Sequence, residues 1–172
     1  MKKLIVLRHA KSSWTEPNTD DFDRPLNERG WKAARRMGRE LKHRKMSFDL
    51  CVASPAERVR ETLDGLAEGY GDFPFPVRFE PQIYLADTVT LMELVQHLAD
   101  DLETVLLVGH NPGLERLLAL LTHDDGRGLR DRVTNKFPTA ALAVIELAAI
   151  SWTAVEPADG RLAELILPKE LD

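Results

Sequence analysis

The sequence lacks the residues on which several classes of protein depend. Cys51 is the only cysteine in 172 residues, which excludes an internal disulfide and a metal site built from several thiolates. It lies in an apolar run at 50–53, where we expect a buried, unreactive thiol. No hydrophobic run reaches the length of a membrane-spanning helix. The apolar run at 4–7 is too short for the core of a signal peptide, so we expect a cytoplasmic protein.

An excess of positive charge is also missing. The formal net charge is −5 at pH 7, so the overall field does not attract a polyanion, and we expect no nucleic-acid partner. Hydrophobic residues make up 44% and charged residues 30%, the balance of an ordinary globular protein. We expect a single domain over residues 1–172, because this length is enough for one buried core.

Strands and helices alternate along most of the chain. Buried strands are predicted at 3–7, 49–53 and 104–108, a short strand at 77–79, and further strands at 140–147, 150–155 and 162–167. Helices are predicted at 28–44, capped by Asn27, at 54–70 with Ser54 as the cap and Pro55 in the first turn, at 88–98, and after 109–112 up to 121. Residues 69–76 and 122–132 are predicted loops. This pattern predicts an α/β fold, a three-layer α/β/α sandwich whose central sheet is mainly parallel with at least one antiparallel strand.

Basic side chains follow the predicted strands. Arg8 and His9 come after the first strand, Arg58 follows the second, and His110 follows the third. Carboxyl ends of parallel strands meet at one edge of a sheet, so these four residues are expected to form a positive pocket. Guanidinium groups match phosphate oxygens, which makes a phosphoryl group the expected ligand.

The pocket suggests nucleophilic chemistry at a histidine. Neighbouring positive charge disfavours protonation of His9, whose neutral ring can attack phosphorus. Arg8, Arg58 and a protonated His110 are then expected to stabilise the transferred group, with no metal or cofactor. Taken singly, each histidine is more often structural than catalytic, and only the joint pattern favours catalysis. The remaining histidines, His43, His97 and His123, are expected at the surface.

Several segments resemble one known family. Residues 8–14 (Arg-His-Ala-Lys-Ser-Ser-Trp) resemble the Arg-His-Gly signature of the histidine phosphatase superfamily, which has the phosphoglycerate mutase-like fold. Residues 21–30, 53–58, 108–112 and 137–140 resemble its SixA-type phosphohistidine phosphatase branch in order and spacing. The resemblance covers essentially the full chain. It implies that His9 is the phosphorylated histidine, that Arg8 and Arg58 bind phosphate, and that His110 is the second histidine of the pocket.

The sequence departs from the family pattern at three places. Ala10 replaces the glycine of the signature, which is harmless where φ is negative. Thr15 replaces an asparagine, although its hydroxyl can still donate a hydrogen bond to substrate. No glutamate can be placed as the general acid, which leaves Asp21 and Asp87 as candidates, with Asp21 preferred as proton donor by the SixA-type pattern.

The leading hypothesis is a phosphatase that acts on phosphohistidine of a protein. An imidazole leaving group needs a weaker acid than an alkoxide does, and the short connections leave only 15–26 and 122–137 to form a lid over the pocket. A small-molecule phosphomonoesterase and a non-catalytic phosphate-binding or scaffold protein remain open as alternatives. The expected partner is a phosphorylated protein or a small phosphorylated substrate, and the oligomeric state is undetermined.

Overall fold

One mixed sheet runs through the molecule. The computed structural model describes residues 1–15 and 17–171, and in this part of the chain seven strands pair in the order β3-β2-β4-β1-β6-β7-β5. Their bounds are β1 Lys2–Arg8, β2 Leu50–Ala53, β3 Val77–Phe79, β4 Thr104–Gly109, β5 Thr122–His123, β6 Leu142–Leu147 and β7 Gly160–Ile166.

Only one strand in this described sheet runs against the others. β4 lies between β1 and β2 and is parallel to both, and β3 is parallel to β2. β6 is antiparallel to β1 and to β7, and β5 is parallel to β7. The prediction of a mainly parallel sheet with at least one antiparallel member is therefore confirmed.

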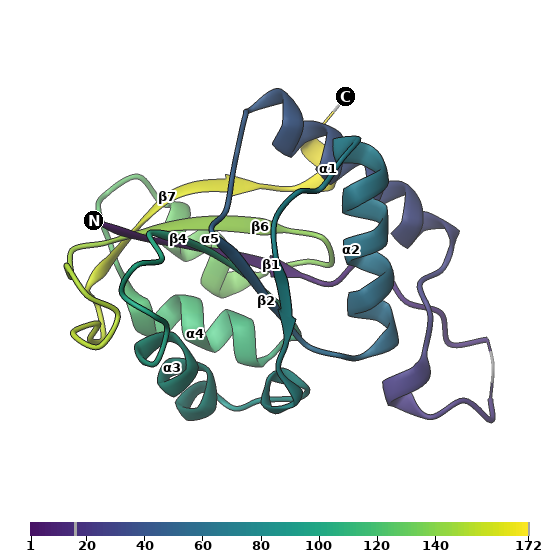
Figure 1. The fold of residues 1–172 in the computed structure, drawn as a ribbon, viewed down its shortest axis with the longest axis horizontal. Helices are drawn as coiled ribbons and strands as arrows, with labels where there is room; N and C mark the ends of the chain where they lie inside the picture. The colour runs from purple at the N-terminus through teal and green to yellow at the C-terminus, as the bar shows by residue number, and fades with distance from the viewer. Residues whose placement is uncertain (16, 172) are drawn as a thin grey trace.

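Helices cover both faces of the sheet (Figure 1). α1 (Glu28–His43) and α2 (Glu57–Tyr70) pack together on one face. α3 (Thr88–Gln96), α4 (Gly113–Leu121) and α5 (Leu129–Asn135) lie on the other. Three short 3-10 helices, η1 (Asp21–Asp23), η2 (Pro81–Ile83) and η3 (Pro168–Glu170), lie in the connections.

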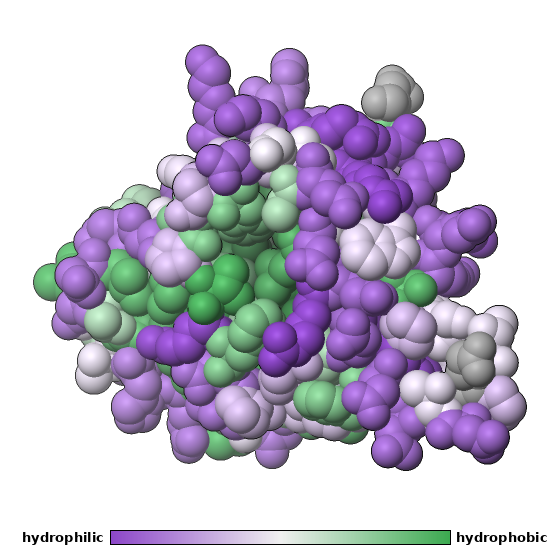
Figure 2. All heavy atoms as spheres, turned by 45° about the vertical axis from the view of Figure 1, so that its right-hand side comes forward, coloured by the Kyte–Doolittle hydropathy of each residue, from purple (hydrophilic) through white to green (hydrophobic). Residues whose placement is uncertain are grey.

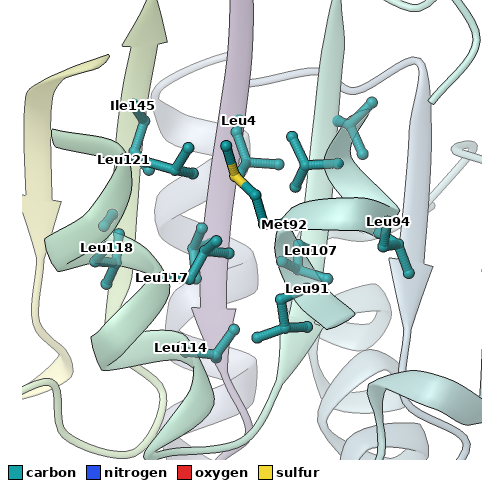
Figure 3. Packing of buried hydrophobic residues seen from close by; sticks show 14 of the residues in the cluster. Leu4, Leu91, Met92, Leu94, Leu107, Leu114, Leu117, Leu118, Leu121 and Ile145 are labelled. Atoms are coloured by element: carbon teal, nitrogen blue, oxygen red, sulfur yellow. The ribbon is translucent and has the colours of Figure 1, made fainter. Parts of the chain in front are cut away.

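The alternating side chains of the strands divide the core into two clusters. In β1, Leu4 and Val6 pack in the cluster beneath α3 and α4, and Ile5 and Leu7 pack in the cluster beneath α1 and α2. Figure 3 shows Leu4 among side chains of α3 and α4. Because successive strand side chains point to opposite faces, a continuous apolar run such as β1 is what a sheet covered on both sides requires. The three-layer prediction is confirmed.

Three local predictions were wrong. The second helix begins at Glu57 with Ala56 in the cap position, not at the predicted cap Ser54. The buried Ser54 hydroxyl contacts His110 instead. Residues 150–155 form bends and turns in place of a strand, and Trp152 enters the core from there with its Nε1 donating to the Leu102 carbonyl at 2.7 Å. The predicted loop at 122–132 contains β5 and the start of α5.

The surface is mostly polar. Figure 2 shows hydrophilic side chains over much of the visible face, around a hollowed hydrophobic patch. Among the helices of the described residues, none is both long and apolar enough to cross a membrane.

Candidate active site

The sheet brings the predicted residues together at one edge. Arg8 ends β1 and pairs in register with Gly109, which ends the neighbouring strand β4. His9 and His110 therefore leave adjacent strands side by side, and their ring centroids are 5.3 Å apart. Arg58 reaches the same place from the first turn of α2.

These four side chains line one cavity of about 320 Å³. The cavity lies beyond the carboxyl ends of β1 and β4, where ligands bind in sheets of this kind. Its described lining consists of Arg8, His9, Lys11, Ser12, Trp14, Arg24, Arg58, Leu85, His110, Asn111 and Thr139. None of these residues is acidic, so the cavity is suited to an anion.

The hydrogen bonding of His9 leaves one ring nitrogen free for chemistry. Nδ1 lies 2.7 Å from the carbonyl oxygen of Ala10, and a carbonyl only accepts, so Nδ1 carries the proton and Nε2 keeps a lone pair. Burial, followed by the positive charges of Arg58 and Arg8, lowers the pKa of His9 to about 4. The ring is therefore neutral at pH 7, as a nucleophile requires.

His110 is neutral as well, which corrects the expectation of a protonated ring. Burial, followed by the neighbouring His9 and Arg58, lowers the pKa of His110 to about 3. Its Nε2 lies 2.8 Å from the hydroxyl oxygen of Ser54, which also accepts a hydrogen bond from the Ala56 amide at 3.3 Å. When the Ser54 hydroxyl donates to Nε2, Nδ1 carries the proton and can donate to a ligand.

The two predicted arginines are fixed by backbone and side-chain oxygens. Arg8 donates from Nη1 to the Phe137 carbonyl at 3.2 Å. Arg58 donates from Nη1 to the Asp21 carbonyl at 2.7 Å and from Nη2 to the Asp21 carboxylate at 3.2 Å. Within the described residues, Nε of both arginines and Nδ1 of His110 are buried without a hydrogen-bond partner. Buried polar groups are normally satisfied, so these three donors lack the partner that such groups normally have.

Asp21 has the geometry of a positioning residue. Its carboxylate accepts from Tyr84 at 2.5 Å and from Arg24 at 3.1 Å, in addition to Arg58. The Tyr84 hydrogen bond, then those from the arginines, lowers the pKa of Asp21 to about 2. A carboxyl group with this pKa is ionised at pH 7, so the proton-donor role of Asp21 stays a prediction that its surroundings do not favour.

The other candidates lie away from the cavity lining. Thr15 is exposed, and its hydroxyl oxygen lies 2.8 Å from that of Ser13. It does not line the cavity, so the structure does not place it for the expected contact with substrate. Asp87 caps α3 by accepting from the Thr90 amide at 2.8 Å. Three histidines are exposed as expected, namely His43, His97 and His123. Cys51 is buried, and burial raises the pKa of its thiol to about 12.

The cavity contains a third arginine that was not predicted from the sequence. Arg24 is buried and donates from Nη1 to the Ser12 hydroxyl at 2.6 Å, while its guanidinium carbon lies 3.4 Å from the ring centroid of Trp14. The segment 21–30 resembles the family pattern, but an irregular loop has no periodicity from which the direction of a side chain can be inferred. Lys11, Ser12, Asn111 and Thr139 were missed for the same reason.

Comparison with known proteins concerns the family and the fold of the chain. Residues 4–83 match the family model of the histidine phosphatase superfamily, branch 1. The chain is 32% identical over 165 residues to an uncharacterized protein of Mycobacterium tuberculosis, covering 95% of this chain and all of that one.

Two solved structures share the whole fold. A SixA protein of Nakamurella multipartitia, an inferred phosphohistidine phosphatase, has a TM-score of 0.83 and 26% identity, covering 97% of this chain and 96% of that one. A SixA protein of Agrobacterium tumefaciens with the same inferred activity has a TM-score of 0.79 and 29% identity, covering 97% and 98%. The chain therefore belongs to the histidine phosphatase superfamily, in its SixA-type branch, and is a phosphatase.

Proposed function

We propose that this phosphatase removes the phosphoryl group from phosphohistidine on a protein, through a phosphohistidine intermediate on His9. The observation that carries the proposal is the neutral His9 ring, with Nδ1 fixed by Ala10 and Nε2 free, beside unpartnered donors of Arg8, Arg58 and His110. A fixed lone pair next to fixed donors is what in-line phosphoryl transfer requires.

The reaction has two steps at the same phosphorus atom. His9 Nε2 attacks, the bond from phosphorus to the substrate's leaving group breaks, and the phosphoryl group is transferred to His9. Arg8, Arg58 and the Nδ1–H of His110 bind its oxygens, where the charge of the transition state lies. Water then attacks the phosphorus, the bond to Nε2 breaks, and inorganic phosphate leaves while His9 regains its lone pair.

The choice of substrate follows from the side chains that line the described part of the cavity. The described cavity lining contains no aspartate or glutamate, and the nearby Asp21 is ionised. An alkoxide leaving group needs a strong proton donor, whereas the imidazole of a phosphohistidine leaves after modest protonation. A phosphoramidate therefore fits this cavity better than a sugar phosphate does.

The proposal also includes independence of metal ions. Arginines and histidines neutralise the phosphoryl charge in this cavity, and the described residues contain no group of three or more His, Cys, Asp or Glu side chains placed to hold an ion. Activity measured after dialysis against EDTA, and again after addition of Mg²⁺, checks this part. We expect equal rates, and a rate restored only by metal would contradict it.

A substrate panel tests the proposed activity. The protein is assayed with a phosphohistidine peptide, p-nitrophenyl phosphate and several sugar phosphates, and reactions with labelled substrate are quenched to trap the phosphoenzyme. We expect the highest kcat/KM with the peptide and an acid-labile, base-stable label that is absent from His9→Ala. Preference for the sugar phosphates would identify a small-molecule phosphomonoesterase, and no turnover with any substrate would indicate a binding protein.

A further inference from the structure

A second, strongly basic groove lies beside the catalytic cavity. It has a volume of about 430 Å³ and lies between the N-terminal half of α1 and the segments around Thr139 and Pro168. Five of its nine lining residues are basic, namely Lys11, Arg29, Lys32, Arg36 and Lys169. On a protein with a net charge of −5, such a local concentration of positive charge is unexpected.

These five cations are not neutralised by ion pairs in the part of the structure that is described. None of them takes part in an ion pair there, and no aspartate or glutamate lines the groove. On the same helix, by contrast, Arg35 is paired with Glu68 at 2.6 Å, and Glu40 is paired at 2.7 Å with Arg44, the residue that follows the helix. Unpaired like charges repel one another, so the groove is a site at which an anion would be stabilising.

The groove is continuous with the cavity and held rigidly to it. Lys11 and Thr139 line both. The Lys11 carbonyl accepts from the Asn27 amide at 3.0 Å, and a Cβ on Gly30 would lie 2.1 Å from that carbonyl oxygen. Only glycine permits this close approach of α1 to the backbone that follows His9. A ligand in the groove is therefore held at a fixed position relative to the phosphoryl site.

We propose that this groove binds an acidic segment of the protein substrate, next to the phosphohistidine that enters the cavity. The proposal rests on the proposed function and specifies its substrate class. Arg29, Lys32 and Arg36 lie three and four residues apart, so they follow one face of α1 over about 10 Å. A row of this length exceeds a single phosphate and fits several carboxylates spaced along a polypeptide.

Because the protein is negatively charged overall, binding of an acidic partner depends on the local positive charge of the groove. The net charge of −5 opposes approach of an acidic protein, but charges separated by more than about 8 Å are largely screened at physiological salt. The contacts within the groove then determine which acidic surface is accepted and in which orientation.

The test compares two phosphohistidine peptides, one with several aspartates and glutamates beside the phosphohistidine and one with glutamines in their place. The variant Arg29→Glu/Lys32→Glu reverses two exposed charges of the groove that lie outside the catalytic cavity. The matched control, Arg39→Glu/Lys45→Glu, makes the same change in charge at exposed positions outside both the groove and the cavity. p-Nitrophenyl phosphate, which has one phosphoryl group and no acidic segment, reports on the chemistry alone.

We expect the wild type to prefer the acidic peptide, and the groove variant to lose at least about tenfold in kcat/KM on it, with the other two substrates changed by less than about twofold. The control variant should keep the preference. Equal rates on the two peptides, or equal losses in both variants, would contradict the proposal that the groove binds an acidic segment. Either result would leave the proposed phosphohistidine activity intact. If neither peptide is hydrolysed while p-nitrophenyl phosphate is turned over, the proposed function is rejected. The proposal that the groove binds a protein substrate is then rejected as well.

Discussion

The two sets of cations at this end of the molecule are built in different ways. In the cavity, Arg8 donates to the Phe137 carbonyl. Arg58 is 3% exposed and makes two hydrogen bonds to Asp21, one to its carbonyl and one to its carboxylate. In the groove, Arg29 and Lys32 are exposed, and the described structure shows no hydrogen bond from their side chains to other residues. Arg36 of the groove does donate to the Pro168 carbonyl at 3.3 Å. The cavity arginines are immobilised before a ligand arrives, whereas Arg29 and Lys32 of the groove are free to adjust.

This difference separates chemistry from recognition. Stabilising a transition state requires donors that are already in place, because reorganisation during the reaction costs free energy. Binding an acidic segment requires only nearby charge, because long flexible side chains can adapt to several arrangements of carboxylates. Changes in the cavity should therefore reduce activity on every substrate, and changes in the groove should alter only the choice between substrates.

The largest expected effect is that of His9→Ala. Removing the nucleophile should lower kcat at least about a thousandfold on phosphohistidine peptide and on p-nitrophenyl phosphate alike. Steady-state assays on both substrates check this, with circular dichroism to confirm folding. A variant that kept most of its activity would show that His9 is not the nucleophile, and would contradict the catalytic role assigned to the cavity.

Arg58→Lys should have the next largest effect. Lysine keeps the charge but not the planar pair of donors that Asp21 orients, so we expect about a hundredfold loss in kcat/KM on both substrates. The matched change in the groove, Arg29→Lys, should cost less than about twofold, because charge alone matters there. Similar losses in the two variants would show that the geometry of the donors matters no more in the cavity than in the groove.

Stability should fall as the pH is lowered, because the cavity histidines are buried in the neutral form. The pKa of His9 is lowered from 6.5 to about 4 in the folded protein, so between these values the unfolded chain binds more protons and acid favours unfolding. Urea denaturation should show His9 lowering the free energy of unfolding by about 2 kcal/mol at pH 5 relative to pH 7. His9→Gln should lose that part of the pH dependence, and an unchanged slope would contradict the buried neutral ring.

Among the changes in the catalytic cavity, the smallest effect is expected for Asp21→Asn. Loss of one charge-assisted hydrogen bond to Arg58 should lower kcat/KM by about tenfold, and equally for substrates with good and poor leaving groups. Asp23→Asn, in the same 3-10 helix and exposed, is the control and should be near wild type. A loss confined to poor leaving groups would identify Asp21 as the proton donor after all.

The strands were predictable because burial on both faces leaves a signature in the sequence. β1 and β4 are continuous apolar runs, and the polar residues that follow them mark the ligand-binding edge. α5 and the turn around Trp152 were not predictable, because their apolar residues are too few to establish a period. Ser54 was misassigned because a serine before a proline matches a helix cap, and no local signal revealed its bond to His110.

The sequence by itself determined the α/β layering. It also determined that four side chains, Arg8, His9, Arg58 and His110, follow strands at the ligand-binding edge of the sheet. Both follow from local patterns of apolar and basic residues. Only the tertiary structure decided that His110 is neutral, that Asp21 holds Arg58, and that Arg24 belongs to the cavity. These properties depend on burial and on contacts between segments far apart in the chain. The electrostatic environment of a side chain is set by such neighbours in space, and the order of residues does not specify them directly.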